Sequence, residues 1–167
     1  MNASSKIVLF IVLLTLFFAC KKSESFSEIP YLEFTKYELK DSVIDALGNS
    51  SDLYKFYLYF TDGNGDIGLS KNDTIHPYEF NLFVNYFEIH QDSLILIDLT
   101  SPYHIRIPNL TPTGQNKSLK GDIVWDVVFF PQDTINRKSD TIKFEFQLFD
   151  RALNKSDWVS SSLIILN

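Results

Sequence analysis

The sequence predicts an all-β protein, an immunoglobulin-like β-sandwich of about seven or eight antiparallel strands that follows an N-terminal signal helix. Three observations support this fold class. Aromatic residues are abundant, with 15 Phe, 8 Tyr and 2 Trp among 167 residues, and such side chains favour strands. Apolar and polar residues alternate in several runs, and turn residues separate these runs. No segment after the signal has a helical period.

The first four predicted strands occupy the first half of the exported chain. Ile29–Lys40 alternates between its two faces, and a polar loop with Gly, Asn and Ser follows it. Leu53–Thr61 carries aromatic residues on both faces, which predicts a central strand. Glu79–His90 alternates again, and a short Gln-Asp-Ser turn joins it to Leu94–Leu99. The last two segments therefore predict a hairpin.

Four further strands are predicted in the second half of the chain. Tyr103–Ile107 lies between two prolines, so we expect it at the edge of a sheet. Gly121–Phe130 and Trp158–Leu166 each follow a polar segment that is rich in turn residues. Thr141–Asp150 has the clearest alternation of the chain, because every second residue is apolar. Its inward-facing side chains are predicted to be Ile142, Phe144, Phe146 and Leu148.

Residues 1–19 have the pattern of an export signal. Lys6 precedes the apolar run Ile7–Phe18, which is shorter than the roughly 20 residues that a membrane-spanning helix needs. Cys20, the only cysteine of the chain, follows a small residue directly. The segment Leu16–Cys20 resembles a bacterial lipobox, in which the cysteine is lipidated and becomes the new N-terminus. We therefore expect Cys20 to hold the protein on membrane lipid in the cell envelope, at the outer membrane.

The chain after the signal is expected to contain one domain. Residues 20–28 are polar and without pattern, which is typical of a tether. Residues 29–167 are enough for a single domain with its own core, and the lone cysteine excludes an internal disulfide bond. The formal net charge of the whole chain is −6. An acidic surface argues against nucleic acid as a partner, because phosphate binding requires a basic face.

The segment Thr61–Leu69 is the strongest candidate for a binding site. Asp62, Asn64 and Asp66 alternate with glycines in this segment. Short acidic side chains on a glycine-rich turn can direct several oxygens at one point, which a hard cation such as Ca²⁺ requires. A tight polar turn that needs glycine for its backbone explains the same residues without a cation. An EF-hand is excluded, because Ile67 stands where that loop requires glycine.

An immunoglobulin-like topology would bring a second segment to this loop. In that fold the loop after the second strand and the loop before the last strand lie at the same end of the sandwich. We therefore expect the residues that follow Thr141–Asp150, with Asp157 among the candidates, to meet the glycine-rich loop. Clustered carboxylates repel one another unless a cation or N–H groups neutralise them. The predicted calcium ligands are Asp62, Asn64, Asp66, Asp150 and Asn154.

Three motifs are spread over the exported chain. They are the Asp-Gly-Asn-Gly-Asp-Ile-Gly-Leu run Asp62–Leu69, the Gly-Gln-Asn-Lys and Lys-Gly-Asp-Ile runs within 114–123, and the Asp-Arg-Ala-Leu-Asn-Lys-Ser run Asp150–Ser156. Together they resemble a family of small Bacteroidota lipoproteins with an Ig-like domain, for which no activity is established. The last motif also resembles the Asp-x-Ala-Gly-Asn-x-Ser turn before the final strand of many bacterial Ig-like modules, with Leu153 in place of glycine. The resemblance implies the fold and the location.

Five Asp-Ser/Thr-apolar sites resemble the O-glycosylation acceptor of exported Bacteroidota proteins. The same three residues also form an ordinary turn before a β-branched strand start. The resemblance therefore leaves both interpretations open. The candidate acceptors are Ser42, Thr74, Ser93, Thr134 and Thr141.

The sequence contains no motif of a known catalytic class. His76, His90 and His104 lie in separate segments without the spacing of a zinc site, and no nucleophile elbow or phosphate loop is present. We therefore expect no enzyme, but a lipid-anchored, non-catalytic binding or structural module of unknown ligand, stabilised by calcium. An outer-membrane protein or a glycan would be its partner. The alternatives are a hydrolase with an unrecognised site and a glycan-binding surface module that exposes Tyr57, Tyr59, Tyr86 or Trp125.

Overall fold

The fold is an all-β sandwich, as the sequence predicts. A computed structural model describes residues 24–44, 48, 50–110, 117–129 and 137–166. Over these residues the chain forms eight strands and no helix. The described residues thus contain no helix that is long and apolar enough to cross a bilayer. The predicted signal helix lies outside the described residues. The strands are β1 (Tyr31–Ile44), β2 (Ser50–Asp62), β3 (Leu82–His90), β4 (Ser93–Leu96), β5 (Leu119–Phe129), β6 (Thr141–Leu148), β7 (Val159–Ser160) and β8 (Ile164–Ile165).

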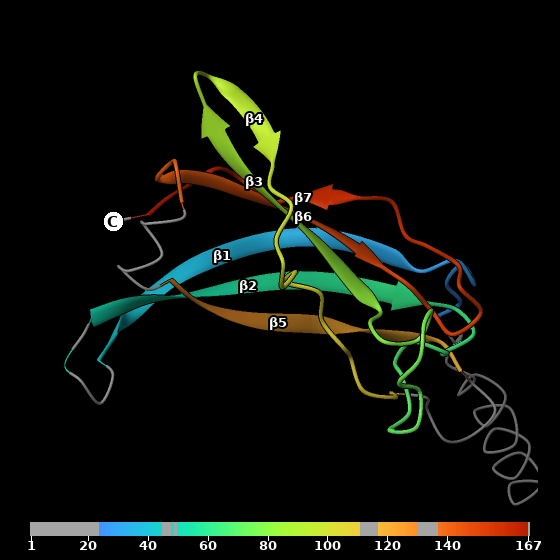
Figure 1. The fold of residues 1–167 in the computed structure, drawn as a ribbon. Helices are drawn as coiled ribbons and strands as arrows, with labels where there is room; N and C mark the ends of the chain where they lie inside the picture. The colour runs from blue at the N-terminus through green and yellow to red at the C-terminus, as the bar shows by residue number, and fades with distance from the viewer. Residues whose placement is uncertain (1–23, 45–47, 49, 111–116, 130–136, 167) are drawn as a thin grey trace, which may run out of the picture.

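The strand order is immunoglobulin-like. One sheet has the order β1-β2-β5 and the other the order β4-β3-β6-β7, with β8 also paired to β6. Figure 1 shows the two sheets as stacked layers, with the hairpin of β3 and β4 projecting beyond them. The second and fifth strands share one sheet and the third and sixth share the other, as in immunoglobulin domains. A bridge between Ile67 and Asp150 brings the chain after β2 to the chain after β6.

The core lies between the two sheets and is rich in aromatic rings. The predicted inward face of β6 is confirmed, because Ile142, Phe144, Phe146 and Leu148 are all fully buried. Phe144 packs edge-on against Phe56 of β2 and Trp125 of β5, with ring centroids 5.1 and 5.2 Å away. Such pairs contribute about 0.5–1.5 kcal/mol each beyond the burial of their area. These contacts join the two sheets at the centre of the sandwich.

Two predicted strands are less regular than expected. Tyr103–Ile107 forms no regular strand; Ile105 instead makes an isolated bridge to Leu82 of β3. The segment Trp158–Leu166 is split into β7 and β8, because the buried Ser161 side chain enters the ladder. Its hydroxyl accepts the N–H of Phe144 at 3.0 Å and so replaces a backbone carbonyl. Side-chain groups of this kind compete with regular strand pairing.

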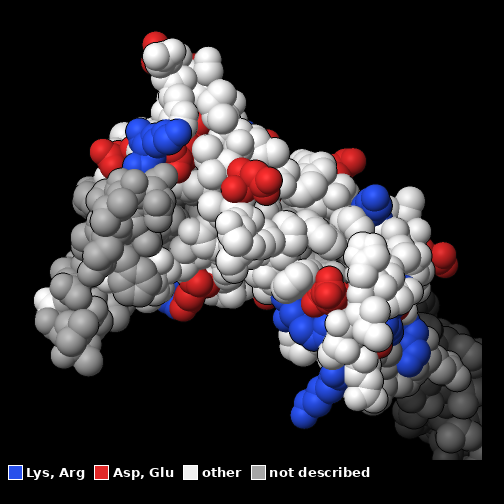
Figure 2. All heavy atoms as spheres, in the orientation of Figure 1, with Lys and Arg blue, Asp and Glu red and all other residues white. Residues whose placement is uncertain are grey.

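One arginine side chain, Arg106, holds the polar loop between β2 and β3 in place. The guanidinium of Arg106 donates hydrogen bonds to the backbone carbonyls of Ser70, Tyr78 and Glu79. A planar guanidinium has five N–H donors, so it can serve several carbonyls at once. On the face of the molecule drawn in Figure 2, charged side chains are scattered among uncharged ones.

Candidate metal centre

Three carboxylates from two distant segments meet at one end of the sandwich. Asp62 ends β2, Asp66 lies in the glycine-rich loop that follows, and Asp150 lies just after β6. One carboxylate oxygen from each lies within 4.8 Å of the other two. Asp62 and Asp150 are buried and Asp66 is half-buried. The structure thus brings together three of the five residues predicted as calcium ligands.

The backbone of the glycine-rich loop places Asp66 beside Asp62. Gly65 and Gly68 both have positive φ angles, 68° and 96°, a conformation that L side chains rarely adopt. Between them the side chain of Ile67 is fully buried and anchors the loop in the core. A side chain at Gly68 would also collide with the backbone of Pro108, since an added Cβ would lie 2.1 Å from its carbonyl oxygen. The glycines are therefore needed for this path of the chain.

The turn after β6 is fixed to the same loop by backbone bonds. The N–H of Arg151 donates to the carbonyl of Asp66 at 3.2 Å. The N–H of Asn154 donates to the Asp150 carboxylate at 2.8 Å, and its side-chain amide donates to the other oxygen at 2.7 Å. Leu153, which stands in place of the glycine of the related motif, has a φ of 65° and so keeps the left-handed turn. The cluster is consequently set on two short turns that are joined by a backbone hydrogen bond.

Two of the carboxylate oxygens in the cluster are buried and have no hydrogen-bond partner among the residues that the structure describes. These atoms are Oδ1 of Asp62 and Oδ1 of Asp66. The second oxygen of Asp62 accepts the N–H of Asp66 at 3.0 Å. Buried polar atoms almost always have partners, because an unpaired one costs about 1–3 kcal/mol and a charged one more. The site therefore presents two buried acceptor atoms that the described part of the chain leaves without a hydrogen-bond partner.

The electrostatics of the cluster are those of crowded acids. Burial, with smaller contributions from the nearby charges of Asp66 and Asp150, raises the pKa of Asp62 to about 6. Burial followed by the charge of Asp150 also raises the pKa of Asp66, although the Arg151 guanidinium acts in the opposite direction. A bound cation would reverse this effect, because it stabilises the ionised carboxylates.

The donor set and its spacing fit a hard divalent cation. All three side chains offer oxygen, which Ca²⁺ and Mg²⁺ prefer, and none offers the nitrogen or sulfur typical of zinc sites. Calcium–oxygen distances are about 2.3–2.6 Å, so two ligands of one ion lie at most about 5 Å apart. The separations within the cluster lie inside that limit. Three carboxylates leave room for the backbone carbonyls or waters that would complete a calcium shell.

The two predicted asparagine ligands hold the acids in place in this structure. The Asn64 side-chain oxygen accepts the N–H of Asp66 at 3.3 Å. Asn154 faces Asp150 with its amide nitrogen, so its side-chain oxygen is not the atom turned to the acids. Asp157 is exposed and lines a groove at the edge of the sandwich. The sequence could not predict which end of each amide faces the cluster.

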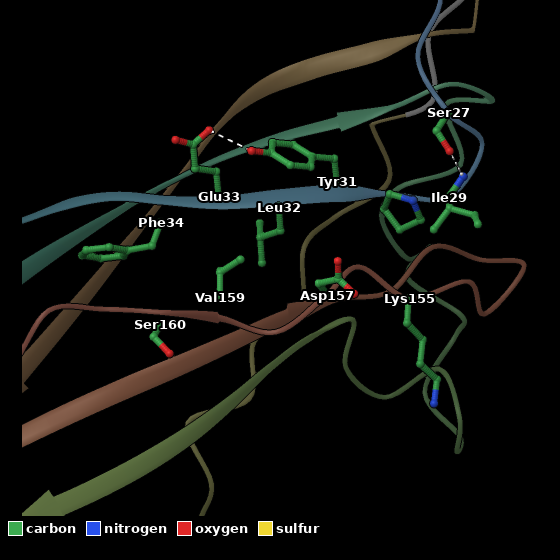
Figure 3. Close-up of a pocket in the computed structure, with 11 residues that line it drawn as sticks. Ser27, Ile29, Tyr31, Leu32, Glu33, Phe34, Lys155, Asp157, Val159 and Ser160 are labelled. Carbon is green, nitrogen blue, oxygen red and sulfur yellow. Dashed lines mark hydrogen bonds between the residues drawn. The ribbon is translucent and has the colours of Figure 1, made fainter. Parts of the chain in front are cut away.

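That groove lies between the edge strands of the two sheets and has a volume of 680 Å³. Figure 3 shows Leu32 and Phe34 of β1 directed toward the side where Val159 of β7 lies, while the Tyr31 hydroxyl donates to Glu33 on the outer side at 3.1 Å. The rings proposed for a glycan platform lie elsewhere. Tyr86 and Trp125 pack into the core, whereas Tyr57 and Tyr59 are half-buried on the outer face of β2.

The remaining predicted sites are scattered. Cys20 and Thr134 lie outside the described residues. Thr74 and Ser93 are exposed, Thr141 is half-buried, and Ser42 belongs to β1. His104 packs against Phe83 and accepts the N–H of Val84 at 3.1 Å, and burial lowers its pKa.

A second polar cluster, around Glu88, was not predicted from the sequence. This residue is buried, although the alternation of β3 already places it on the inward face with Leu82, Val84 and Tyr86. Its carboxylate accepts the Tyr86 hydroxyl at 3.2 Å and the N–H of Lys138 at 3.0 Å, and it pairs with His90 at 2.8 Å. The sequence does contain a signal for this cluster, because the charged Glu88 falls on the face of β3 where the preceding residues are apolar.

The fold and the acidic cluster define a β-sandwich with an immunoglobulin-like strand order and three clustered carboxylates at one end. Comparisons with protein-family models, with curated proteins and with solved structures give no match to this chain.

Proposed function

We propose that this chain is a non-catalytic, calcium-stabilised binding module of the cell envelope, held at the membrane by lipid on Cys20. The observation that carries the calcium part is the pair of buried, partnerless oxygens of Asp62 and Asp66, which lie beside the carboxylate of Asp150. The lipid anchor rests on the lipobox-like segment and stays a prediction, as does attachment to an outer-membrane partner.

Calcium would act here as a clamp between two turns. The glycine-rich loop extends β2 of one sheet, and the Asp150 turn extends β6 of the other. An ion that takes ligands from both turns therefore stabilises the packing of the two sheets at this end. Because the ion binds the folded chain only, it raises the free energy of unfolding by RT ln(1 + [Ca²⁺]/Kd), about 2.7 kcal/mol at a hundredfold excess over Kd.

The test is a thermal melt of the full-length protein, purified in a non-ionic detergent, with calcium and with chelator. We expect a rise of about 6–10 °C in Tm at a hundredfold excess over Kd and a stoichiometry of one by titration calorimetry. Asp66→Asn should remove most of this rise. Asp122→Asn is the matched control, because Asp122 is an exposed carboxylate on β5 that pairs with Tyr59 and is not a member of the acidic cluster.

Two results would decide against this function. Equal melting temperatures in calcium and chelator would reduce the cluster to a polar turn. A calcium response that Asp66→Asn leaves intact and Asp122→Asn abolishes would place the ion elsewhere. Magnesium in place of calcium tests the identity of the ion, since it requires a smaller octahedral shell at about 2.0–2.1 Å.

A further inference from the structure

We infer that the cavity at the opposite end of β6 binds a small, apolar monocarboxylate, with Arg137 as the residue that recognises the carboxylate. Glu88 pairs with Ile142 near the start of β6, whereas Asp150 follows the end of that strand. The cavity is therefore about 26 Å from the acidic cluster, eight residues along the strand at roughly 3.3 Å per residue. It is a separate site, and its occupancy does not depend on calcium.

The cavity combines apolar walls with two buried charges. Its volume is 240 Å³. The walls come from β3, from the chain after β4, from the end of β5 and from the segment before β6. The N–H of Ile97 donates to the carbonyl of Tyr86 at 2.9 Å, which holds one wall against β3. The lining residues are Tyr86, Glu88, Ile97, Leu99, Tyr103, Phe129 and Arg137.

Arg137 is the polar group of this cavity to which the described residues offer no buried pairing partner. Its side chain is only 7% exposed, and its Nε has no hydrogen-bond partner. Its carboxylate neighbour, Asp140, contacts the far nitrogen of the guanidinium at 3.3 Å and is itself 73% exposed. A buried cation is costly unless it is paired and hydrogen-bonded. An anion that enters the cavity would supply the missing partner.

Glu88 does not fill that role and limits how the ligand lies. Its carboxylate is already paired with His90 and accepts bonds from Tyr86 and Lys138. A ligand carboxylate beside Glu88 would be repelled, so the charged end must lie at Arg137 and the apolar body must lie along the aromatic walls. This arrangement favours one negative charge at one end of the molecule over a dianion or a zwitterion.

The volume sets the size of the ligand. An apolar protein cavity of about 150 Å³ takes up a benzene ring. A cavity of 240 Å³ therefore holds one ring with a short carboxylate arm, or an aliphatic acid of similar size. Tyr86 and Tyr103, with ring centroids 5.8 Å apart, form one aromatic wall against which such a ring can pack.

Phenylacetate and its neutral analogue phenylacetamide are suitable probes of the full-length protein. Titration calorimetry, with detergent alone as the blank, should show binding of phenylacetate and at least tenfold weaker binding of the amide. Arg137→Gln should weaken phenylacetate binding by about tenfold or more, because a hydrogen bond to a charged group is lost. Arg137→Lys should retain part of the affinity, and Glu88→Gln should not weaken it.

Leu99→Trp provides a second variant that does not depend on how Arg137→Gln folds. The larger ring fills the cavity and should abolish binding while Arg137 stays in place. The inference is overturned if wild-type protein binds no phenylacetate up to millimolar concentration. It is also overturned if the amide binds equally well, or if neither Arg137→Gln nor Leu99→Trp changes the affinity. The calcium-dependent melt can be positive or negative in each case, so the two proposals fail separately.

Discussion

Replacing Asp62 with asparagine should have opposite effects on stability in chelator and in calcium. Asn is nearly the same size as Asp and can still accept the N–H of Asp66 through its side-chain oxygen. It carries no charge, and its amide can donate to the partnerless Oδ1 of Asp66. Without a cation, Asp62→Asn therefore removes a buried charge and satisfies a buried acceptor. With calcium, the same change removes a ligand.

The size of the first effect follows from the pKa of Asp62. Burial raises it from the ordinary 3.8 to about 6, and one pKa unit corresponds to about 1.36 kcal/mol. The folded chain holds a proton between these pH values that the unfolded chain has released, so stability falls as pH rises through about 6. At pH 8 in chelator, the asparagine variant should therefore be about 2–3 kcal/mol more stable than wild type, and the difference should shrink below pH 5.

The size of the second effect follows from mass action. Calcium bound at the proposed site would add about 2.7 kcal/mol to the free energy of unfolding of wild type at a hundredfold excess over Kd, and about 4.1 kcal/mol at a thousandfold excess. The variant gains less because it has lost a charged ligand. Between these two concentrations wild type should overtake the variant.

Urea unfolding of both proteins at pH 8, in chelator and over a calcium series, measures the crossover directly. A variant that is less stable than wild type in chelator would show that the Asp62 carboxylate has a structural partner. An identical calcium response of the two proteins would remove Asp62 from the metal site.

Three further predictions concern the turns and the core. Leu153→Gly should raise the free energy of unfolding by about 0.5–1 kcal/mol, since the left-handed φ of 65° at this position is costly for a residue with a side chain. Urea unfolding measures the change, and a loss of stability would contradict the prediction. Gly63→Ala should lower the free energy of unfolding by about 1–3 kcal/mol, because an added Cβ would lie 2.7 Å from the Ser27 carbonyl oxygen that accepts the Gly63 N–H. An unchanged midpoint of urea unfolding would refute this close contact. His104 has a lowered pKa through burial, so its contribution to stability is lost as pH falls below about 6.5. His104→Asn keeps an acceptor for Val84 and should show a flatter pH dependence of the unfolding midpoint between pH 7.5 and 5.

The regular parts of the fold could be predicted because one face of each strand is buried. Every second residue of Thr141–Leu148 is apolar, and those residues are the fully buried ones. The breaks were not predictable in this way. Ser161 interrupts the last strand with a hydroxyl that substitutes for a carbonyl, and polar alternation alone does not show such a bond. Tyr103–Ile107 follows the chain beside β3 with a single bridge at Ile105.

The acidic cluster could be predicted in outline from topology. Two loops at the same end of an immunoglobulin-like sandwich bring Asp62, Asp66 and Asp150 together. The finer roles depend on side-chain orientation, which no sequence period encodes. Asn154 directs its amide nitrogen at Asp150, and the buried guanidinium of Arg137 lies before β6 in a polar stretch that had no alternating pattern.

The entry point of the chain into the domain has a mechanical consequence. The Gly63 N–H donates to the Ser27 carbonyl at 2.7 Å, one residue away from Asp62. A pulling force applied ahead of residue 24 therefore reaches the glycine-rich loop before it can separate β1 from β2. The resistance of the domain to such a force would be set by this loop, and an ion clamped between the loop and the Asp150 turn would increase the load at which the sandwich begins to open.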